Sequence, residues 1–174
     1  MQEINQTDRM DGSASISVRR AVREDIPELI RLLYQVHRVH SNGRPDLFRA
    51  GEKKYTEGEL GEILADGTKP VFVGVLNGCV AGYAFCILRQ QDSRSMTDIR
   101  TLYIDDLCVD EELRGRRIGE QLYRYVLDFA ERSGCHNVTL NVWACNPAAL
   151  RFYEKCGLSV QKIGMEQLLP ASRR

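Results

Sequence analysis

The chain has 174 residues, which is enough for one domain with a substantial core, and its 43% hydrophobic and 28% charged content is that of an ordinary globular protein. Its 24 basic residues balance its 24 acidic ones, so it lacks the basic field typical of proteins that bind nucleic acid or an anionic membrane. No apolar run is long enough to span a bilayer.

The first residues are polar and carry no apolar stretch of the kind found in signal peptides. We therefore expect a lead-in over residues 1–14, a single domain over 15–169, a short tail over 170–174 and a cytoplasmic protein. The six cysteines form no C-x-x-C pair and lie mostly in apolar segments or at their ends. Small buried thiols are favoured over a disulfide framework or zinc, and no metal site is predicted.

The first half of the chain predicts one strand, two helices and a hairpin. Residues 15–21 alternate as a strand does, and the apolar spacing over 24–40 predicts an amphipathic helix that Gly43 and Pro45 interrupt. A second helix is expected to start at Thr56, since Thr56 and Glu59 have capping-box spacing. Residues 70–76 and 79–88 predict two strands joined by a tight Asn77-Gly78 turn.

The second half alternates strands and helices. Residues 99–109 predict a long strand, and helical spacing from Ile118 continues until Gly134 supplies a stop. Residues 138–144 predict another strand, and a short helix follows with Asn146 as its cap and Pro147 in its first turn. Residues 158–169 are predicted as a last strand. The order β-α-α-β-β-β-α-β-α-β indicates a mixed α/β fold with four helices packed on one sheet.

The run "ELRGRRIGEQL", residues 111–121, places Arg114, Arg116 and Arg117 at the start of a helix, where the helix dipole disfavours positive charge. A strand that enters a glycine-containing turn and then a helix presents free amides that suit phosphate, and arginines become favourable once an anion binds there. The alternative is a solvated turn in which these arginines pair with Glu111, Glu112 and Glu120. The turn alone does not decide between the two, and neither a G-x-G-x-x-G fingerprint nor a Walker A loop is present.

The run "LCVDEELRGRRIGEQLYRYVLDFAE" resembles the coenzyme A-binding segment of the GCN5-related N-acetyltransferase (GNAT) superfamily, whose pattern is Arg/Gln-x-x-Gly-x-Gly/Ala. Arg114 and Gly119 match its first and last positions, whereas Arg117 stands at the usual middle glycine. "NPAALRFYEKCGLSV" resembles the second signature of this superfamily, in which an asparagine opens a helix bearing A-x-x-F-Y-E-K. The resemblance covers nearly the whole chain and implies a central, mostly antiparallel twisted sheet of about six to seven strands.

The resemblance also implies an acetyl-CoA-dependent enzyme that transfers acetyl directly to a primary amine of a small molecule or peptide. By it, Tyr153 lies near the coenzyme A sulfur and acts as general acid, although an ordinary core tyrosine is the structural alternative. Relatives are often dimers, so a homodimer is one expectation. The residues implied in cofactor binding are Leu107, Cys108, Val109, Arg114, Gly115, Arg116, Arg117, Ile118, Gly119, Glu120 and Asn146.

Two adjacent aspartates in the long predicted strand suggest a functional role, because aspartate is disfavoured in strands. Unless a bulge intervenes, Asp105 and Asp106 face opposite sides of the sheet. Spermidine/spermine acetyltransferases of the superfamily carry a similar pair, and by that resemblance Asp105 is the candidate base and Asp106 binds the amine. A salt bridge from this pair to Arg100 or Arg114 is an equally weighted alternative.

The segment between the first two helices often lines the acceptor site in this superfamily, so the resemblance makes His37, His40 and Asp46 candidate substrate-binding residues. Histidines that cap the end of a helix are an equal alternative. Trp143 is expected in the core. The rival functions are a protein lysine or N-terminal acetyltransferase and a non-catalytic acyl-CoA-binding module, with a nucleic-acid-binding domain as a weaker third.

Overall fold

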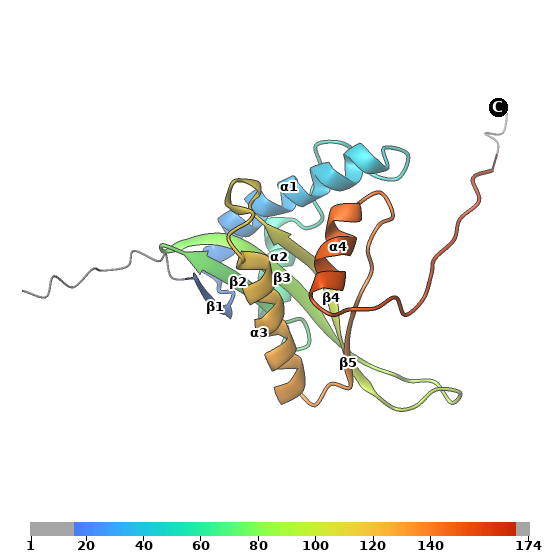
Figure 1. Ribbon diagram of the computed structural model, residues 1–174. Coiled ribbons are helices and arrows are strands. Elements are labelled where there is room, and N and C mark those ends of the chain that lie inside the picture. Colours follow the sequence, from blue (N-terminus) through green and yellow to red (C-terminus); the bar gives the residue numbers. More distant parts are fainter. Residues whose placement is uncertain (1–15, 170–174) are drawn as a thin grey trace, which may run out of the picture.

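The computed structural model describes residues 16–169, which form a five-stranded sheet with helices on both faces (Figure 1). Single 3-10 turns lie at Arg23–Asp25 and Glu111–Leu113. The helices and strands are β1 (Ile16–Arg20), α1 (Ile26–Gly43), α2 (Glu57–Ala65), β2 (Val71–Leu76), β3 (Cys79–Gln90), β4 (Arg100–Val109), α3 (Ile118–Arg132), β5 (Asn137–Leu140) and α4 (Pro147–Lys155).

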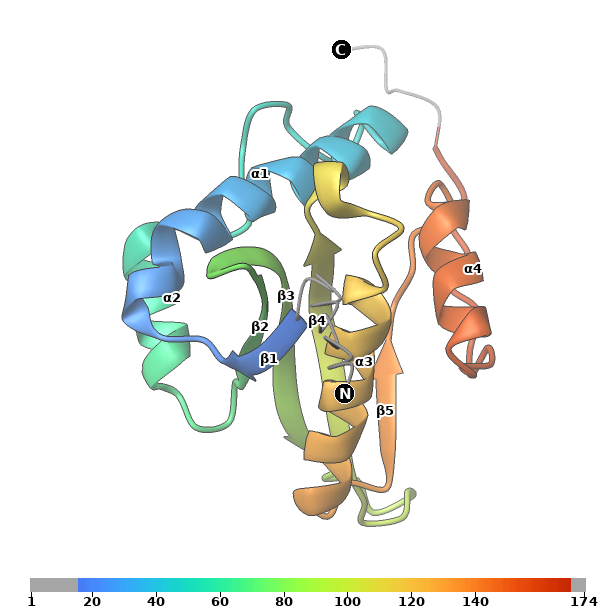
Figure 2. The same ribbon diagram turned by 60° about the vertical axis from the view of Figure 1, so that its left-hand side comes forward.

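The strands lie in the order of the chain, β1-β2-β3-β4-β5. The first four are antiparallel to their neighbours, and only β5 runs parallel to β4. Figure 2 shows α1 and α2 on one side of the sheet and α3 on the other, with α4 beside β5. The mixed α/β fold and its four helices are therefore confirmed.

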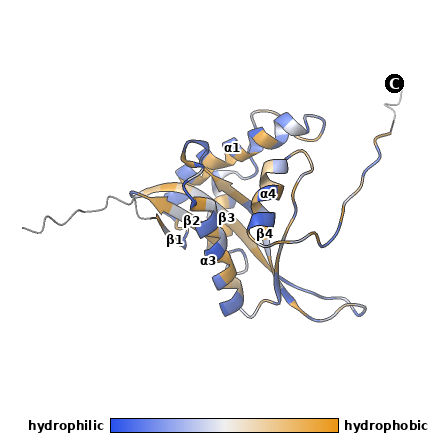
Figure 3. Cartoon of the chain, in the orientation of Figure 1, coloured by the Kyte–Doolittle hydropathy of each residue, from blue (hydrophilic) through white to orange (hydrophobic). Residues whose placement is uncertain are grey.

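Two apolar clusters fill the two sides of the sheet. Figure 3 shows hydrophobic residues concentrated along the strands, with hydrophobic and hydrophilic residues alternating along the helices. One cluster joins α3 to the sheet through residues such as Leu122 and Val126. The other joins α1 and α2 to the opposite face through residues such as Leu29, Leu33 and Leu60. Buried side chains of this size supply most of the driving force for folding.

The local signals that mark element boundaries are confirmed. The Thr56 hydroxyl accepts from the Glu59 N–H at 3.3 Å, and the Glu59 carboxylate accepts from the Thr56 N–H at 2.7 Å, as a capping box requires. Asn77 and Gly78 both have positive φ, at 51° and 82°, which matches the tight hairpin turn. The Asn146 side chain caps α4 by accepting from the Ala149 N–H at 3.1 Å.

Three expectations about the fold are wrong. The sheet has five strands rather than six to seven, because residues 158–169 run extended without pairing to another strand of residues 16–169. The first helix continues to Gly43, three residues past its predicted end, and stops two residues before Pro45. β5 ends at Leu140, short of the predicted residue 144, because it leaves β4 there.

The expected lead-in over 1–14 and tail over 170–174 lie outside the described residues. Within residues 16–169, none of the helices has the length and apolar character needed to cross a membrane.

Candidate functional site

A β-bulge in β4 places both aspartates on the same face of the sheet. Phe85 of β3 pairs with Asp106, whereas the next residue, Cys86, pairs with Ile104, so Asp105 is the extra residue. After the bulge, the alternation of side chains between the two faces of the sheet is reversed. Ile104 packs in the cluster under α3, whereas Cys108 packs in the cluster under α1 and α2. The sequence did not decide whether this strand has a bulge. In the structure the bulge is present, and it brings Asp105 and Asp106 to the same face.

Asp105 is held by two donors from the segment that leads into α2. Its carboxylate accepts from the Tyr55 hydroxyl at 2.6 Å and forms an ion pair with the Lys54 ammonium at 2.7 Å. Neither predicted alternative partner pairs with it, since the Arg100 guanidinium donates to the Ser133 carbonyl and Arg114 has no ion pair among residues 16–169.

Asp106 has a different environment. Its carboxylate accepts one side-chain hydrogen bond, from the buried Tyr83 hydroxyl at 2.9 Å. Burial raises the pKa of Asp106 to about 6, while the nearby Lys54 charge and the Tyr83 hydrogen bond oppose the rise. A carboxyl group with this pKa can exchange a proton near neutral pH.

β4 and β5 separate beyond Ile104, which opens the sheet next to the acidic pair. Their parallel pairing covers only Thr101 to Ile104 of β4, and β4 then continues alone to Val109. The β5-facing backbone edge of Leu107, Cys108 and Val109 therefore has no strand beside it within residues 16–169. Such an edge can accept an extended ligand by backbone hydrogen bonds.

Tyr153 of α4 lies on the other side of this opening, with 9% of its surface exposed. Its hydroxyl has no hydrogen-bond partner among the described side chains and backbone groups. Burial, and then the charge of Asp106, raise the pKa of the Tyr153 phenol well above its ordinary value. The phenol thus remains protonated at neutral pH and is free to donate.

The turn after β4 presents a run of unused backbone donors. In the described structure, no N–H group from Arg114 to Glu120 donates to an acceptor, and the first helical bond is from the Gln121 N–H to the Arg117 carbonyl at 3.1 Å. Gly115 has a φ of 79° and Arg117 a φ of 61°, which bends the turn so that it leads into α3. Arg117 therefore adopts the left-handed conformation that glycine adopts more easily at this position.

The three arginines of this turn are exposed and form no ion pairs among residues 16–169. Glu111 pairs instead with Arg38 at 2.6 Å, and Glu120 with Lys155 at 2.6 Å. The solvated turn with internal pairing is therefore not what this structure contains. Free amides and unpaired guanidinium groups together fit a multiply charged anion.

The family to which the chain belongs follows from a comparison with known proteins. The model of the acetyltransferase (GNAT) family matches residues 33–158, which include β4, the turn and α4. The chain belongs to the GNAT family. The two sequence signatures that resembled this family, in the turn after β4 and in α4, both lie within the match.

Two curated GNAT relatives differ in their amine substrates. The chain is 29% identical to bovine thialysine N-epsilon-acetyltransferase over 141 residues, which cover 81% of this chain and 76% of that one. It is 34% identical to the Arabidopsis thaliana glucosamine 6-phosphate N-acetyltransferase, but only over 65 residues, 37% of this chain and 42% of that enzyme. The chain thus matches less than half of the length of the glucosamine 6-phosphate enzymes.

Solved structures agree with the fold. A crystal structure of a mutant protein from Bacillus halodurans has a TM-score of 0.85 and 30% identity, and the match covers 88% of this chain and 99% of that one. The Arabidopsis thaliana glucosamine-6-phosphate N-acetyltransferase structure has a TM-score of 0.66 at 22% identity, which supports the fold alone.

The histidines predicted at the acceptor site belong to an aromatic cluster at the end of α1. Phe48 contacts His37, His40 and Trp143, with ring centroids 5.9, 5.3 and 5.3 Å away. The His37 ring also donates a hydrogen bond from Nε2 to the Arg49 carbonyl at 2.6 Å. Burial, then the charges of His37 and Lys54, lower the pKa of His40, so its ring is neutral at neutral pH. Lys54 lies between this cluster and the acidic pair, because its charge acts on His40 and it forms an ion pair with Asp105.

The expectation that Trp143 lies in the core is wrong, and the predicted substrate-binding role of Asp46 stays a prediction. Trp143 is not in the core, since 41% of its surface is exposed and it packs edge-on against Phe48. Asp46 is exposed and pairs with Arg44 at 2.7 Å, and no contact joins it to the aspartates of β4 in the described residues.

The cysteines are mixed in exposure. Cys86 and Cys108 are buried as expected, whereas Cys79 and Cys145 are exposed. Burial raises the pKa of the Cys108 thiol to about 12, which makes it a poor nucleophile.

The sequence analysis did not identify the residues that hold the turn between β4 and α3 in place. Asp110 is 6% exposed and accepts from Arg31 of α1 at 2.5 Å, from Gln35 at 3.4 Å and from the Glu112 N–H at 3.1 Å. In return, the Gln35 amide oxygen accepts from the Glu111 N–H at 3.1 Å. The polar residue that ends a strand before a 3-10 turn is the signal that could have identified Asp110 as a cap.

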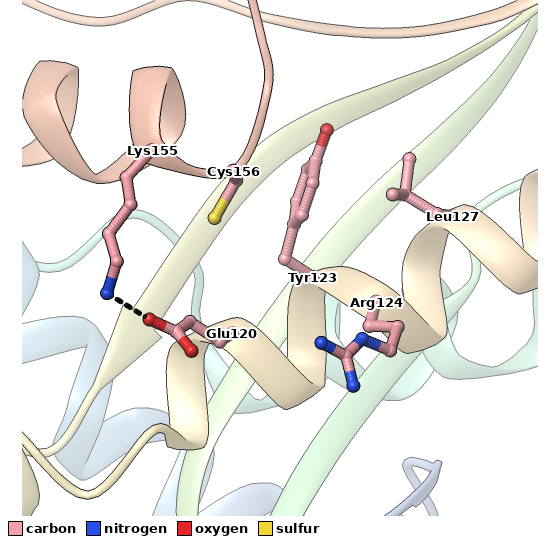
Figure 4. Close-up of a pocket in the computed structure, with 6 residues that line it drawn as sticks. All are labelled: Glu120, Tyr123, Arg124, Leu127, Lys155 and Cys156. Atoms are coloured by element: carbon pink, nitrogen blue, oxygen red, sulfur yellow. Dashed lines mark hydrogen bonds and ion pairs between the residues drawn. The ribbon is translucent and has the colours of Figure 1, made fainter.

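Two hollows lie beside the site. One of about 240 Å³ lies between α3 and α4, where Lys155 and Cys156 face Glu120 and Tyr123 (Figure 4). The other, of about 110 Å³, opens on Tyr55, Phe85 and Asp105 near α2. The smaller hollow reaches Asp105 and offers apolar walls next to its carboxylate.

Proposed function

We propose that this GNAT protein transfers acetyl from acetyl-CoA directly to a primary amine that is positively charged in solution, on a small molecule or a peptide. The observation that carries the proposal is the bulge in β4. It sets two carboxylates, Asp105 and Asp106, at the point where the sheet opens and where the Tyr153 phenol lies near Asp106.

The residues around the opening suit coenzyme A. The free amides of residues 114–120 and the unpaired Arg114, Arg116 and Arg117 side chains would hold its phosphates. The open edge of Leu107 to Val109 would bind its extended arm, with the Asn146 end of α4 opposite. Bound there, acetyl-CoA supplies the activated acyl group.

The acidic pair would bind and deprotonate the amine. A free alkylammonium has a pKa near 10 and must lose its proton to become nucleophilic. The contacts favour Asp106 as the base over Asp105, because Asp105 already holds the Lys54 ammonium and the Tyr55 hydroxyl, whereas Asp106 has a pKa of about 6 and one hydroxyl donor. Asp105 would then help to orient the cationic acceptor, with Tyr55 beside it.

Tyr153 would donate its proton to the departing thiolate. Its raised phenol pKa keeps the proton in place, and its hydroxyl is not engaged by another described residue. The transfer would be direct from acetyl-CoA to the amine, and the buried Cys108 thiol, which is protonated at neutral pH, would not carry the acetyl group.

The test is thiol release from acetyl-CoA across a panel of polyamines, amino acids, amino sugars, aminoglycosides and lysine or N-terminal peptides. We expect turnover with at least one cationic small amine or amine-bearing peptide. We also expect Tyr153→Phe to lower kcat by about 100-fold with little change in the Kd for coenzyme A. The matched control is Tyr125→Phe, which removes a hydroxyl from an α3 tyrosine packed on Phe72.

Three outcomes would contradict the proposal or part of it. If coenzyme A does not bind, as judged by calorimetry, the proposal is wrong at its first step. If coenzyme A binds but Tyr153→Phe turns over as fast as the wild type, Tyr153 is not the acid. Binding without turnover on any amine would instead support the non-catalytic acyl-CoA-binding module.

A further inference from the structure

The chain places a primary amine of its own at the acidic pair. The Lys54 ammonium donates to Oδ2 of Asp105 at 2.7 Å and to the Asp105 backbone carbonyl at 3.4 Å. The Tyr55 hydroxyl donates to the same Oδ2 at 2.6 Å. An ammonium on a flexible four-carbon arm therefore occupies the position in which Asp105 would receive the ammonium of an acceptor.

This ion pair conflicts with the binding of a cationic acceptor. Lys54 already pairs with the Asp105 carboxylate, whose side chain is only 17% exposed. A second ammonium brought to the same carboxylate would meet a like charge a few ångströms away, which is unfavourable. Lys54 therefore competes with the acceptor until its charge is removed or its side chain leaves.

The other lysines of residues 16–169 have different surroundings. None of their ammonium groups bonds to a carboxylate of the acidic pair, and they are Lys53, Lys69, Lys155 and Lys162. Lys53, the neighbour of Lys54, donates to the Tyr34 hydroxyl at 3.0 Å. Lys69 lines the same small hollow as Asp105, but its ammonium pairs with Asp66 at 3.2 Å. The position of Lys54 is therefore specific rather than a general property of exposed lysines.

We propose that the protein acetylates Nζ of its own Lys54, within one copy of the chain, and that this modification frees Asp105 for a cationic acceptor. Because self-acetylation rests on the proposed function, it uses the same acidic pair and the same acetyl-CoA. The Lys54 side chain is 41% exposed, so it can turn toward solvent once the ion pair is lost.

The Lys54 nitrogen forms an amide bond to the acetyl carbon as the bond from that carbon to the coenzyme A sulfur breaks. The ammonium loses two protons in all. Asp106, which lies on the same face as Asp105 and has a pKa of about 6, takes the first and passes it to solvent. Tyr153 protonates the departing thiolate and regains its proton from the new amide nitrogen. The product amide has no charge, so the ion pair with Asp105 is lost.

Mass spectrometry of the full chain, before and after incubation with acetyl-CoA and no added amine, tests this modification. We expect a gain of one acetyl group, which peptide mapping locates at Lys54. The rate constant should not depend on protein concentration, because the reaction takes place within one copy. Butylamine reproduces the alkyl arm and the ammonium of a lysine side chain, so an excess of it should slow the labelling of Lys54.

Three variants sharpen the measurement. Lys54→Arg keeps a positive charge beside Asp105 but has no amine to acetylate, so it should gain no acetyl group. Lys53→Arg is the matched control, and it should be labelled at Lys54 as fast as the wild type. A second measurement needs no acetyl-CoA. By calorimetry, Lys54→Gln, which is neutral like acetyl-lysine, should bind butylamine about fivefold more tightly than Lys54→Arg.

Labelling of Lys53, Lys54 and Lys69 at similar rates, unaffected by butylamine, overturns self-acetylation, because acetyl-CoA would then react with exposed lysines chemically. A rate constant that rises with protein concentration also overturns it, since one copy would then acetylate another. Equal affinities of Lys54→Gln and Lys54→Arg for butylamine overturn the release of Asp105. Turnover of a free amine with no label at Lys54 overturns self-acetylation and leaves the proposed function intact. Neither turnover nor label overturns both.

Discussion

Two neighbouring carboxyl groups of the same kind have different chemistry here because their surroundings differ. Asp105 has an ammonium and a phenol as donors, whereas Asp106 has one phenol and is more strongly desolvated. Different surroundings of this kind can give two carboxyl groups different roles in one site. It leads to a prediction about stability as well as activity.

Asp106→Asn should stabilise the protein at pH 8 and leave it unchanged near pH 4. The folded state raises the Asp106 pKa from 3.8 to about 6, so it favours the protonated form, and the wild type loses stability as the pH rises through this window. The amide removes that penalty, about 2 kcal/mol after allowance for partial exposure. Urea unfolding at both pH values measures it, and kcat/KM should fall on the order of 100-fold.

Asp105→Asn is the matched control. It removes the charge that pairs with Lys54, so it should not stabilise the protein at pH 8. If both variants have the same pH dependence of unfolding, the distinction between the two carboxyl groups is wrong.

Arg117→Gly should raise stability by about 0.5 to 1 kcal/mol. Arg117 is held at a φ of 61°, where a side chain is strained and glycine is not. Thermal unfolding measures the gain. The control is Arg116→Gly in the same exposed turn, where φ is not positive and the substitution should destabilise slightly.

The same substitution tests what the Arg117 side chain contributes to the ligand. Its backbone N–H remains in the variant, but its exposed charge is lost. We expect the affinity for coenzyme A to fall about fivefold at low salt and by less at high salt. An affinity that does not change would mean that only the backbone of this residue serves the phosphates.

At the scale of elements, the site depends on how β4, the turn and α3 are held against α1. Asp110 ends β4, caps the short 3-10 turn and pairs with Arg31 of α1. Gly119 in the first turn of α3 lies so close to Phe152 of α4 that an added Cβ would be 3.2 Å from the ring. The loop therefore takes its position from two helices, one on each side.

Asp110→Ala should weaken coenzyme A binding on the order of tenfold and cost about 1 to 2 kcal/mol of stability. The change removes a cap and leaves the Gln35 and Arg31 donors without their acceptor, so the turn loses its attachment to α1. Calorimetry with coenzyme A and urea unfolding measure the two effects. The control Glu28→Ala removes the other partner of Arg31, on the exposed face of α1, and should change both by little.

Local sequence patterns predicted the elements well because short-range chemistry decides their boundaries. The Thr56–Glu59 box, the Asn77-Gly78 turn and the Asn146 cap each depend on residues within four positions of one another. Tyr153 and the arginine turn also lie in short contiguous motifs, so the elements that carry them could be predicted from the sequence.

What the sequence could not predict depends on pairing between distant residues. The bulge at Asp105 exists only relative to the register of β3, so alternation along β4 alone could not place the two carboxylates. Lys54 and Tyr55 reach Asp105 across 50 or more positions of the chain. The segment 158–169 has the composition of a strand, but a strand needs a neighbour, and sequence alone does not show that none of residues 16–169 pairs with it.

At the scale of the whole molecule, the candidate site lies where two parts of the sheet separate. The larger part, with α1 and α2, carries β4, the acidic pair and the turn. The smaller part, β5 with α4, carries Tyr153 and Asn146. A ligand that occupies the opening contacts both parts and should stabilise them together.

Coenzyme A should therefore raise the free energy of unfolding of the whole protein, by about 2.7 kcal/mol at a concentration of one hundred times its Kd. The phosphates should supply much of this through the amides of residues 114–120 and the three unpaired arginines, so pantetheine, which lacks them, should give a much smaller shift at the same concentration. Raising the salt should reduce the coenzyme A shift and leave the pantetheine shift nearly unchanged, because only charged contacts are screened. Thermal unfolding monitored by tyrosine and tryptophan fluorescence measures the shift for each of the two ligands at low and at high salt. Equal shifts from the two ligands would mean that the arginine turn does not hold the phosphates, even if the opening between β4 and β5 holds the arm.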